Sequence, residues 1–189
     1  MGAGFLSEKM QIPQASIGRM LNSLEKRGFL QKVSNKGRQI TPAGLGWLEE
    51  QHARKAKLHS SQKLISIVEE LSKERLMEIL DIRKLLEGTS VELACKNASD
   101  EDIEELEDIL LDHMYAVRHD ESGSAEDLRL HLMIAKVSKN VTLYQIIELI
   151  LTGKNAYDTF SAVADHVTHT QIQQHTDLIA AIKARDPVR

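Results

Sequence analysis

Apolar residues recur at helical spacing along most of the chain, and the first clear stripe covers residues 14–27. Its apolar positions are three, one and three residues apart, so that they share one face of a helix: Ile17, Met20, Leu21 and Leu24. Pro13 suits the first turn of this helix, and Gly28 suits its C-terminal cap. A short helix is predicted before the break, at residues 5–10.

The pattern then changes for a short distance. It predicts a strand, a turn, a returning strand and a further helix, at residues 29–33, 34–37, 38–41 and 42–57. Helix, turn, helix, hairpin and helix is the order of a winged helix-turn-helix, in which the second helix enters the major groove of DNA and the hairpin touches the backbone or the minor groove.

Only helical patterns follow. They cover residues 58–72, 73–97, 99–118, 127–140, 140–153, 154–170 and 171–185. Ser99 with Asp102 three residues later is close to a capping box for the 99–118 helix. We therefore expect a mainly α protein: a winged helix-turn-helix domain at residues 1–58, a linker helix at 59–74 and an all-α bundle at 75–189.

Charge separates the same two regions. Residues 1–58 hold ten Lys or Arg against four Glu and no Asp, a net charge of +6, whereas residues 59–189 carry −10. A basic small domain beside an acidic larger one predicts that only the first meets a polyanion. Chance clustering of solvated charge is the alternative.

The predicted DNA contacts are polar or basic side chains on the second helix and on the wing. Gln, Asn and Arg can read base edges, and Lys and Arg neutralise phosphates. The candidates are Gln14, Ser16, Arg19, Asn22, Lys32, Asn35, Lys36 and Arg38. A winged helix that serves only protein contacts is the alternative.

Composition narrows the classes of protein to which the chain could belong. Aromatic residues make up 4% of the chain, which disfavours proteins that bind single strands by stacking. The single cysteine, Cys95, lies in an apolar helical run and allows no disulfide within the chain. Because no stretch has the length of a membrane span or the character of a signal peptide, we expect a cytoplasmic protein.

A candidate metal site lies in DLRLHLMIAKVSKN, at residues 127–140. Asp127 and His131 are four residues apart and therefore share one helix face. Carboxylate oxygen and imidazole nitrogen both suit a divalent metal of the Zn, Ni or Mn type, with further ligands from other helices. An ion pair or a capped core histidine would produce the same spacing.

Residues 11–44 resemble the winged helix of bacterial repressors of the MarR and GntR kinds. SLEKRGFL followed by ITPAGLGWLEE is similar to the MarR type. GntR proteins usually carry arginines early in the recognition helix, where this chain has Gln14 and Gly18. The start also looks short, as though the first helix were missing.

Residues 75–186 resemble the FCD ligand-binding domain of FadR-subfamily GntR regulators. The resemblance rests on EILDIRKLLEGTSVELACKNASDEDIEELEDIL, DLRLHLMIAKVSKN and HTDLIAAIKARD. It implies that Asp127, His131 and His175 hold a metal, and that the last ligand and last helix of the family pattern fall beyond Arg189. The pair of His166 and His169 also resembles ligands, but we expect these two to face solvent or line the pocket.

The same resemblance implies that Arg83 faces the pocket and binds the carboxylate of a small effector. An ion pair with Glu87, four residues later, is the alternative. No general base in a motif, no phosphate loop and no nucleophile constellation is present, so we do not expect an enzyme.

The resemblances together imply a bacterial transcription regulator, most simply a repressor. It would act as a homodimer on a double-stranded operator and respond to a metal and a small carboxylate effector. A helical sensor or interaction module whose winged helix does not bind DNA is the alternative, favoured by Gln14, Gly18 and the short start.

Overall fold

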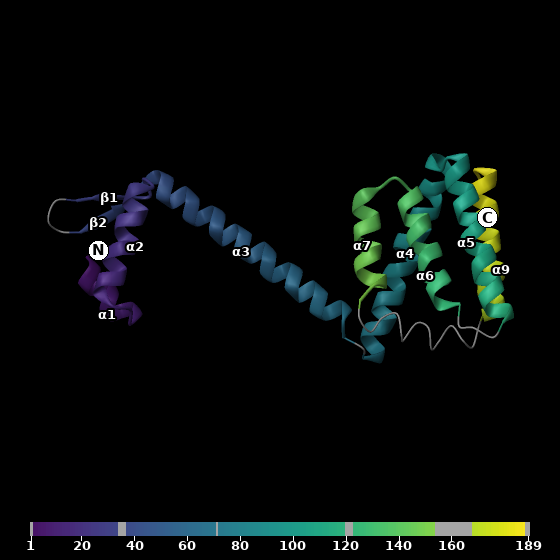
Figure 1. The fold of residues 1–189 in the computed structure, drawn as a ribbon, viewed down its shortest axis with the longest axis horizontal. Helices are drawn as coiled ribbons and strands as arrows, with labels where there is room; N and C mark the ends of the chain where they lie inside the picture. The colour runs from purple at the N-terminus through teal and green to yellow at the C-terminus, as the bar shows by residue number, and fades with distance from the viewer. Residues whose placement is uncertain (1, 34–36, 71, 120–122, 154–167, 188–189) are drawn as a thin grey trace. The chain divides into compact units, whose positions relative to one another are not determined.

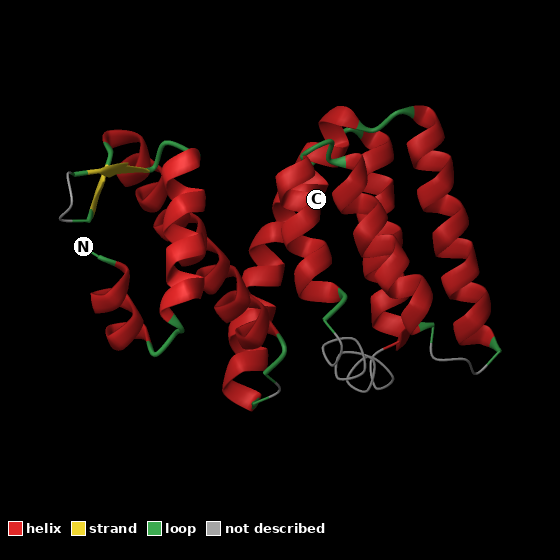
Figure 2. Ribbon diagram, turned by 60° about the vertical axis from the view of Figure 1, so that its left-hand side comes forward, coloured by secondary structure: helices red, strands yellow, loops and turns green. Residues whose placement is uncertain are grey.

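The computed structural model describes residues 2–33, 37–70, 72–119, 123–153 and 168–187. The chain divides into two compact units, Met1–Lys63 and Leu64–Arg189. The domain limits expected from the sequence, after residues 58 and 74, stay a prediction. The mainly α fold is confirmed: the described part consists of helices and one small sheet (Figure 2).

The first unit contains two helices, a hairpin and the start of a third helix. The helices α1 (Ala3–Met10) and α2 (Gln14–Lys26) precede the strands β1 (Leu30–Lys32) and β2 (Arg38–Ile40). The strands are antiparallel, and Gln31 lies opposite Gln39. The order of elements is the predicted one, and the predicted apolar stripe buries Ile17 and Leu21 of α2.

The long helix α3 (Pro42–Val68) begins directly after the hairpin. Its start packs so closely on the hairpin that a Cβ at Gly44 would lie 2.1 Å from the carbonyl oxygen of Phe29. Phe29 stacks on Trp47 with ring centroids 5.1 Å apart, and the Arg27 guanidinium lies 4.8 Å from the Phe29 ring centroid. These contacts join the segment between α2 and β1 to the first turns of α3.

One sequence prediction was wrong here. The sequence suggested a helix that ends near Lys57 and a separate linker helix from residue 59, whereas α3 runs without a break to Val68. Residues 47–68 contain no Gly or Pro, so no strong helix breaker stands at the position where the sequence suggested a break.

The second unit is an all-α bundle. Its helices are α4 (Lys73–Asn97), α5 (Asp100–Arg118), α6 (Ser124–Val137), α7 (Val141–Leu151) and α9 (Thr168–Ala184). The helix α6 packs on α4, α5 and α7, and α9 packs on α4 and α5 (Figure 1). Of the helix predicted at 154–170, residues 154–167 lie outside the described residues.

The core of the bundle centres on α6, where Leu130, Ala135 and Val137 are fully buried. Ser99 and Asp102 form the expected capping box at the start of α5. The helix α4 buries Ile79, Ala94 and Cys95, whereas Leu80, Ile82 and Leu85 are exposed. No helix in the described part of the chain is long and apolar enough to cross a membrane.

Candidate metal site

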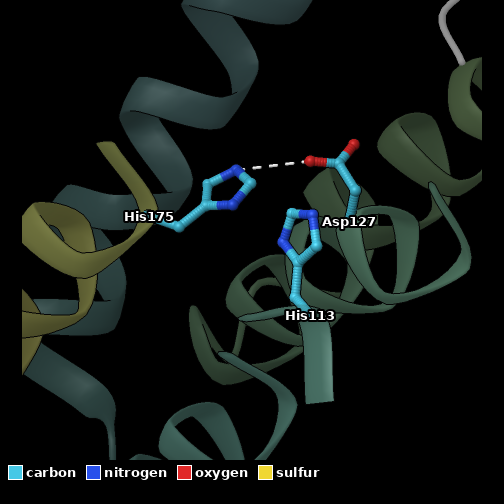
Figure 3. A group of neighbouring side chains, drawn as sticks. All are labelled: His113, Asp127 and His175. Atoms are coloured by element: carbon cyan, nitrogen blue, oxygen red, sulfur yellow. Dashed lines mark ion pairs between the residues drawn. The ribbon is translucent and has the colours of Figure 1, made fainter. Parts of the chain in front are cut away.

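Three side chains from three helices meet inside the bundle. His113 of α5, Asp127 of α6 and His175 of α9 each offer a ligand atom, and these atoms all lie within 4.8 Å of one another (Figure 3). The Nε2 atom of His175 is 3.4 Å from Oδ1 of Asp127. His113 and His175 are buried, with 1% and 4% of their surfaces exposed.

Helical periodicity explains why these side chains point inward. His113 follows the buried residues Leu106 and Ile109 at intervals of three and four, so it continues the core stripe of α5. His175 precedes the buried residues Ile179 and Ile182 of α9 at the same spacing. Asp127 lies in the first turn of α6, where its backbone N–H donates to the carbonyl of Gly123 at 2.9 Å.

His131 lies beside the cluster, one turn beyond Asp127 on α6. Its Nε2 atom is 3.7 Å from Oδ1 of Asp127, and its ring meets that of His175 edge-on with centroids 5.2 Å apart. The structure therefore brings together the three residues named from the sequence, Asp127, His131 and His175. Sequence reasoning missed His113, although an imidazole within the apolar stripe of residues 99–118 was a signal that could have been read.

Several buried polar atoms of the cluster lack a hydrogen-bond partner among the described residues. They are Oδ1 of Asp127, Nδ1 of His113 and Nδ1 of His175. A buried polar atom that is left unsatisfied costs about 1–3 kcal/mol, so three in one place are unusual. A divalent ion accepts oxygen and imidazole nitrogen as ligands, and the donor set therefore fits a metal.

The shifted pKa values of His113, His175 and Asp127 favour the protonation states that bind metal. Burial lowers the pKa of His113, and burial together with His131 lowers the pKa of His175 to about 4, so both are neutral near pH 7. Burial also opposes charge on Asp127, but the His131 imidazole, with those of His175 and His113, outweighs it and lowers the pKa of that carboxyl. Neutral imidazoles beside a carboxylate are the forms that bind metals.

A second carboxylate links this cluster to α4. Nδ1 of His131 lies 3.3 Å from Oε2 of Glu87, and Nε of Arg83 donates to Oε1 of the same carboxylate at 2.8 Å. Burial lowers the pKa of His131, but the carboxylates of Asp127 and Glu87 outweigh it and the net shift is upward. The alternative considered for Arg83, an ion pair with Glu87, is present.

A cavity of about 190 Å³ opens on the α4 side of His131. Its walls are mainly apolar, and Lys84, Glu87, Ser90 and His131 supply the polar groups. Arg83 does not line this cavity; it bonds to Glu87, which does. The side chains of His166 and His169 lie outside the described residues.

The residues expected to contact DNA divide into several groups. Gln14, Arg19, Asn22 and Lys32 are exposed, whereas Ser16 and Arg38 are half-buried. Arg38 bonds to Asn22 and donates through Nε to Oε2 of Glu25 at 2.7 Å, which ties the wing to α2. Asn35 and Lys36 lie outside the described residues.

Comparison with known proteins places the bundle in a family. The FCD domain matches residues 78–189. The HTH-type transcriptional regulator LutR of Bacillus subtilis (strain 168) is 23% identical over 138 residues, which are 73% of this chain and 57% of that protein. The chain therefore spans somewhat more than half the length of this relative.

Two solved structures share the fold. The GntR protein of Streptococcus agalactiae superposes with a TM-score of 0.51 at 21% identity, over 100% of this chain and 80% of that one. E. coli McbR/YncC superposes with a TM-score of 0.53 at 20% identity, over 99% and 77%.

Proposed function

This chain belongs to the FCD-domain family, within the FadR subfamily of GntR-type regulators. From that premise we propose that it is a DNA-binding transcription regulator. The observation that carries the proposal is the combination on one chain of a winged-helix unit and an FCD bundle. The first unit would bind a double-stranded operator, and the bundle would sense a ligand.

The N-terminal unit supports DNA binding through its exposed polar surface. Gln14, Arg19 and Asn22 of α2 would reach base edges or phosphates in the major groove, with Ser16 beside them. Lys32, Asn35, Lys36 and Arg38 of the wing would neutralise phosphates. The excess of basic residues in positions 1–58 favours the same role.

Fluorescence anisotropy would test this role directly. The purified protein is titrated into labelled DNA from upstream of its own gene, with a scrambled duplex of equal composition as competitor. We expect saturable binding that resists the scrambled duplex. Weak binding to both duplexes alike, lost with added salt, would contradict a sequence-specific regulator.

We further propose that the bundle holds a divalent metal through Asp127, His131 and His175. A bound ion would supply positive charge and open coordination positions to which a small carboxylate effector could bind. Glu87 would hold Nδ1 of His131, so that Nε2 faces Asp127. Arg83 would bind the effector carboxylate, which requires it to leave Glu87.

Replacing His131 by Ala tests the metal role. Metal at 100 times its Kd stabilises a folded protein by about 2.7 kcal/mol, so Zn²⁺ should raise the parent's melting temperature. His131→Ala should lose most of that rise and most of the metal retained on desalting, as measured by elemental analysis. Equal metal content in variant and parent would contradict the proposed ligand.

The quaternary state is part of the same proposal. GntR-type regulators commonly dimerise, and α4 and α7 expose large apolar side chains, among them Leu85 and Val141, at 67% and 75%. A homodimer would present two winged helices to a palindromic operator. An effector that favours one arrangement of these units over another would change operator affinity, as in a repressor.

The alternative function is a helical sensor that does not bind DNA. One observation favours it: Arg38 and Asn22, two of the expected DNA contacts, already bond to each other, and Arg38 also pairs with Glu25. The anisotropy measurement decides between the two functions, because a sensor alone would leave the labelled operator unbound.

A further inference from the structure

We propose that His113 is a direct ligand of the metal, so that the site is built by α5 as well as by α6 and α9. This inference rests on the proposed metal binding and adds a ligand to it. With His113, four protein side chains would surround the ion: His113, Asp127, His131 and His175.

The geometry of the three-helix cluster is the first argument. Two ligands with bonds of about 2.0–2.1 Å to one tetrahedral ion lie about 3.3 Å apart. The ligand atoms of His113, Asp127 and His175 are already within 4.8 Å of one another, so small side-chain rotations would bring them to bonding distance. Figure 3 shows the His113 ring facing the side chains of Asp127 and His175.

The unsatisfied nitrogen of His113 is the second argument. Nδ1 of His113 is buried and has no hydrogen-bond partner among the described residues. Nδ1 of the nearby His175 is likewise buried and without such a partner. The two ring centroids are 5.4 Å apart. A core that needed only to be filled would be more stable with leucine at such a position, because leucine has no polar atom to desolvate. A ligand role explains why imidazoles stand there.

The backbone beside His113 is the third argument. Gly123, the N-cap residue before α6, has a φ of +64°, a backbone conformation that residues with a side chain rarely adopt. A Cβ there would lie 2.7 Å from Cδ2 and 2.9 Å from Nε2 of His113. The absence of a side chain at Gly123 lets the ring lie directly against the turn that leads to Asp127, four residues later.

Four protein ligands would change what the ion can bind. A tetrahedral metal such as Zn²⁺ would have no open position left, whereas an octahedral metal would keep two. A carboxylate effector that binds the ion therefore requires either an octahedral metal or the departure of one side chain.

The test compares the full-length parent with His113→Leu, after both are stripped of metal and titrated with Zn²⁺ or Co²⁺ alone. Leucine fills the core, so the metal-free variant should be at least as stable as the metal-free parent. We expect its metal affinity to fall by more than the 10–100-fold that loss of an outer partner costs, and its Co²⁺ absorption spectrum to change. His119→Gln, an exposed change at the C-cap of the same helix, is the matched control and should match the parent.

The outcomes separate the two proposals. If the parent binds metal and His113→Leu binds it with the same affinity and the same Co²⁺ spectrum, the ligand role of His113 is wrong and the metal site stands. If the parent binds no metal, the metal proposal itself is wrong, and the ligand role fails with it. Should His113→Leu fail to fold, nitrogen NMR of the parent replaces it: Zn²⁺ must shift the His113 ring nitrogens, and unchanged resonances would overturn the proposal.

Discussion

At the scale of single residues, Glu87 contacts both Arg83 and His131 beside the candidate metal site. One of its oxygens accepts from Arg83, and the other faces Nδ1 of His131. A carboxylate on one ring nitrogen of a histidine fixes the tautomer and turns the other nitrogen toward the metal. Glu87 would thus couple the arginine proposed for the effector to a proposed ligand.

Glu87→Gln should therefore weaken metal binding without removing a ligand. We expect a 10- to 100-fold increase in the Kd for Zn²⁺, measured in competition with a chromophoric chelator. Glu92→Gln, an exposed change on the same helix, is the control and should leave the Kd unchanged. An unaltered Kd in Glu87→Gln would show that Glu87 does not orient a ligand.

At the scale of elements, the start of α5 is fixed by its capping box. The Ser99 hydroxyl accepts from the Asp102 backbone, the Asp102 carboxylate accepts from the Ser99 backbone at 3.0 Å, and Lys139 donates to that carboxylate at 2.7 Å. The hydrogen bond from Lys139 lowers the pKa of Asp102, with help from Ser99 and against the effect of burial.

This arrangement predicts a pH-dependent stability. Because the folded-state pKa lies below the unfolded value of about 3.9, the contribution of Asp102 is present above that value and is lost as pH falls through the folded pKa. Asp102→Asn should lower the free energy of unfolding by about 0.3–1 kcal/mol at pH 7 and make it less dependent on pH in the acid range, as measured by urea unfolding. Asp108→Asn, exposed on the same helix, should keep the parent's profile; an unchanged profile in Asp102→Asn would contradict the argument.

Sequence patterns sufficed for elements whose causes are local. The helix α2, the hairpin, the bounds of α4 and the Ser99 cap all depend on residues within a few positions of one another, and the structure confirms them. Of the predicted α2 stripe, Ile17 and Leu21 are buried, whereas Met20 is exposed. The uninterrupted α3 was missed: the helices expected at 42–57 and from residue 58 are one helix as far as Val68. The Arg83–Glu87 pair was foreseen as an alternative because it lies within one turn.

The candidate site could be predicted only in part. Asp127 and His131 share one helix and were found from spacing, and His175 was named from a resemblance. His113 belongs to another helix, and its approach to His175, 62 positions later, depends on how α5 and α9 pack. No local pattern encodes that convergence.

At the scale of the whole molecule, the proposed DNA binding would fall to the basic unit, because residues 1–58 carry +6 and residues 59–189 carry −10. Each phosphate contact that is removed should reduce the salt slope of binding by about 0.9. Arg38→Ala should therefore weaken binding to all sequences alike and flatten the salt dependence. Because Arg38 also ties the wing to α2 through Glu25, Lys32→Ala is the matched variant: it removes an exposed charge without that tie. Unchanged salt slopes in both variants would remove the wing from the interface.

The single tryptophan of the chain gives the molecule a built-in optical reporter. Trp47 is stacked on Phe29, below the Arg27 guanidinium, and all three belong to the first unit. Its emission therefore reports on the first unit, while metals and carboxylates would act on the bundle. A change of Trp47 emission on metal addition would be direct evidence of a signal that travels between the two units, read without any label.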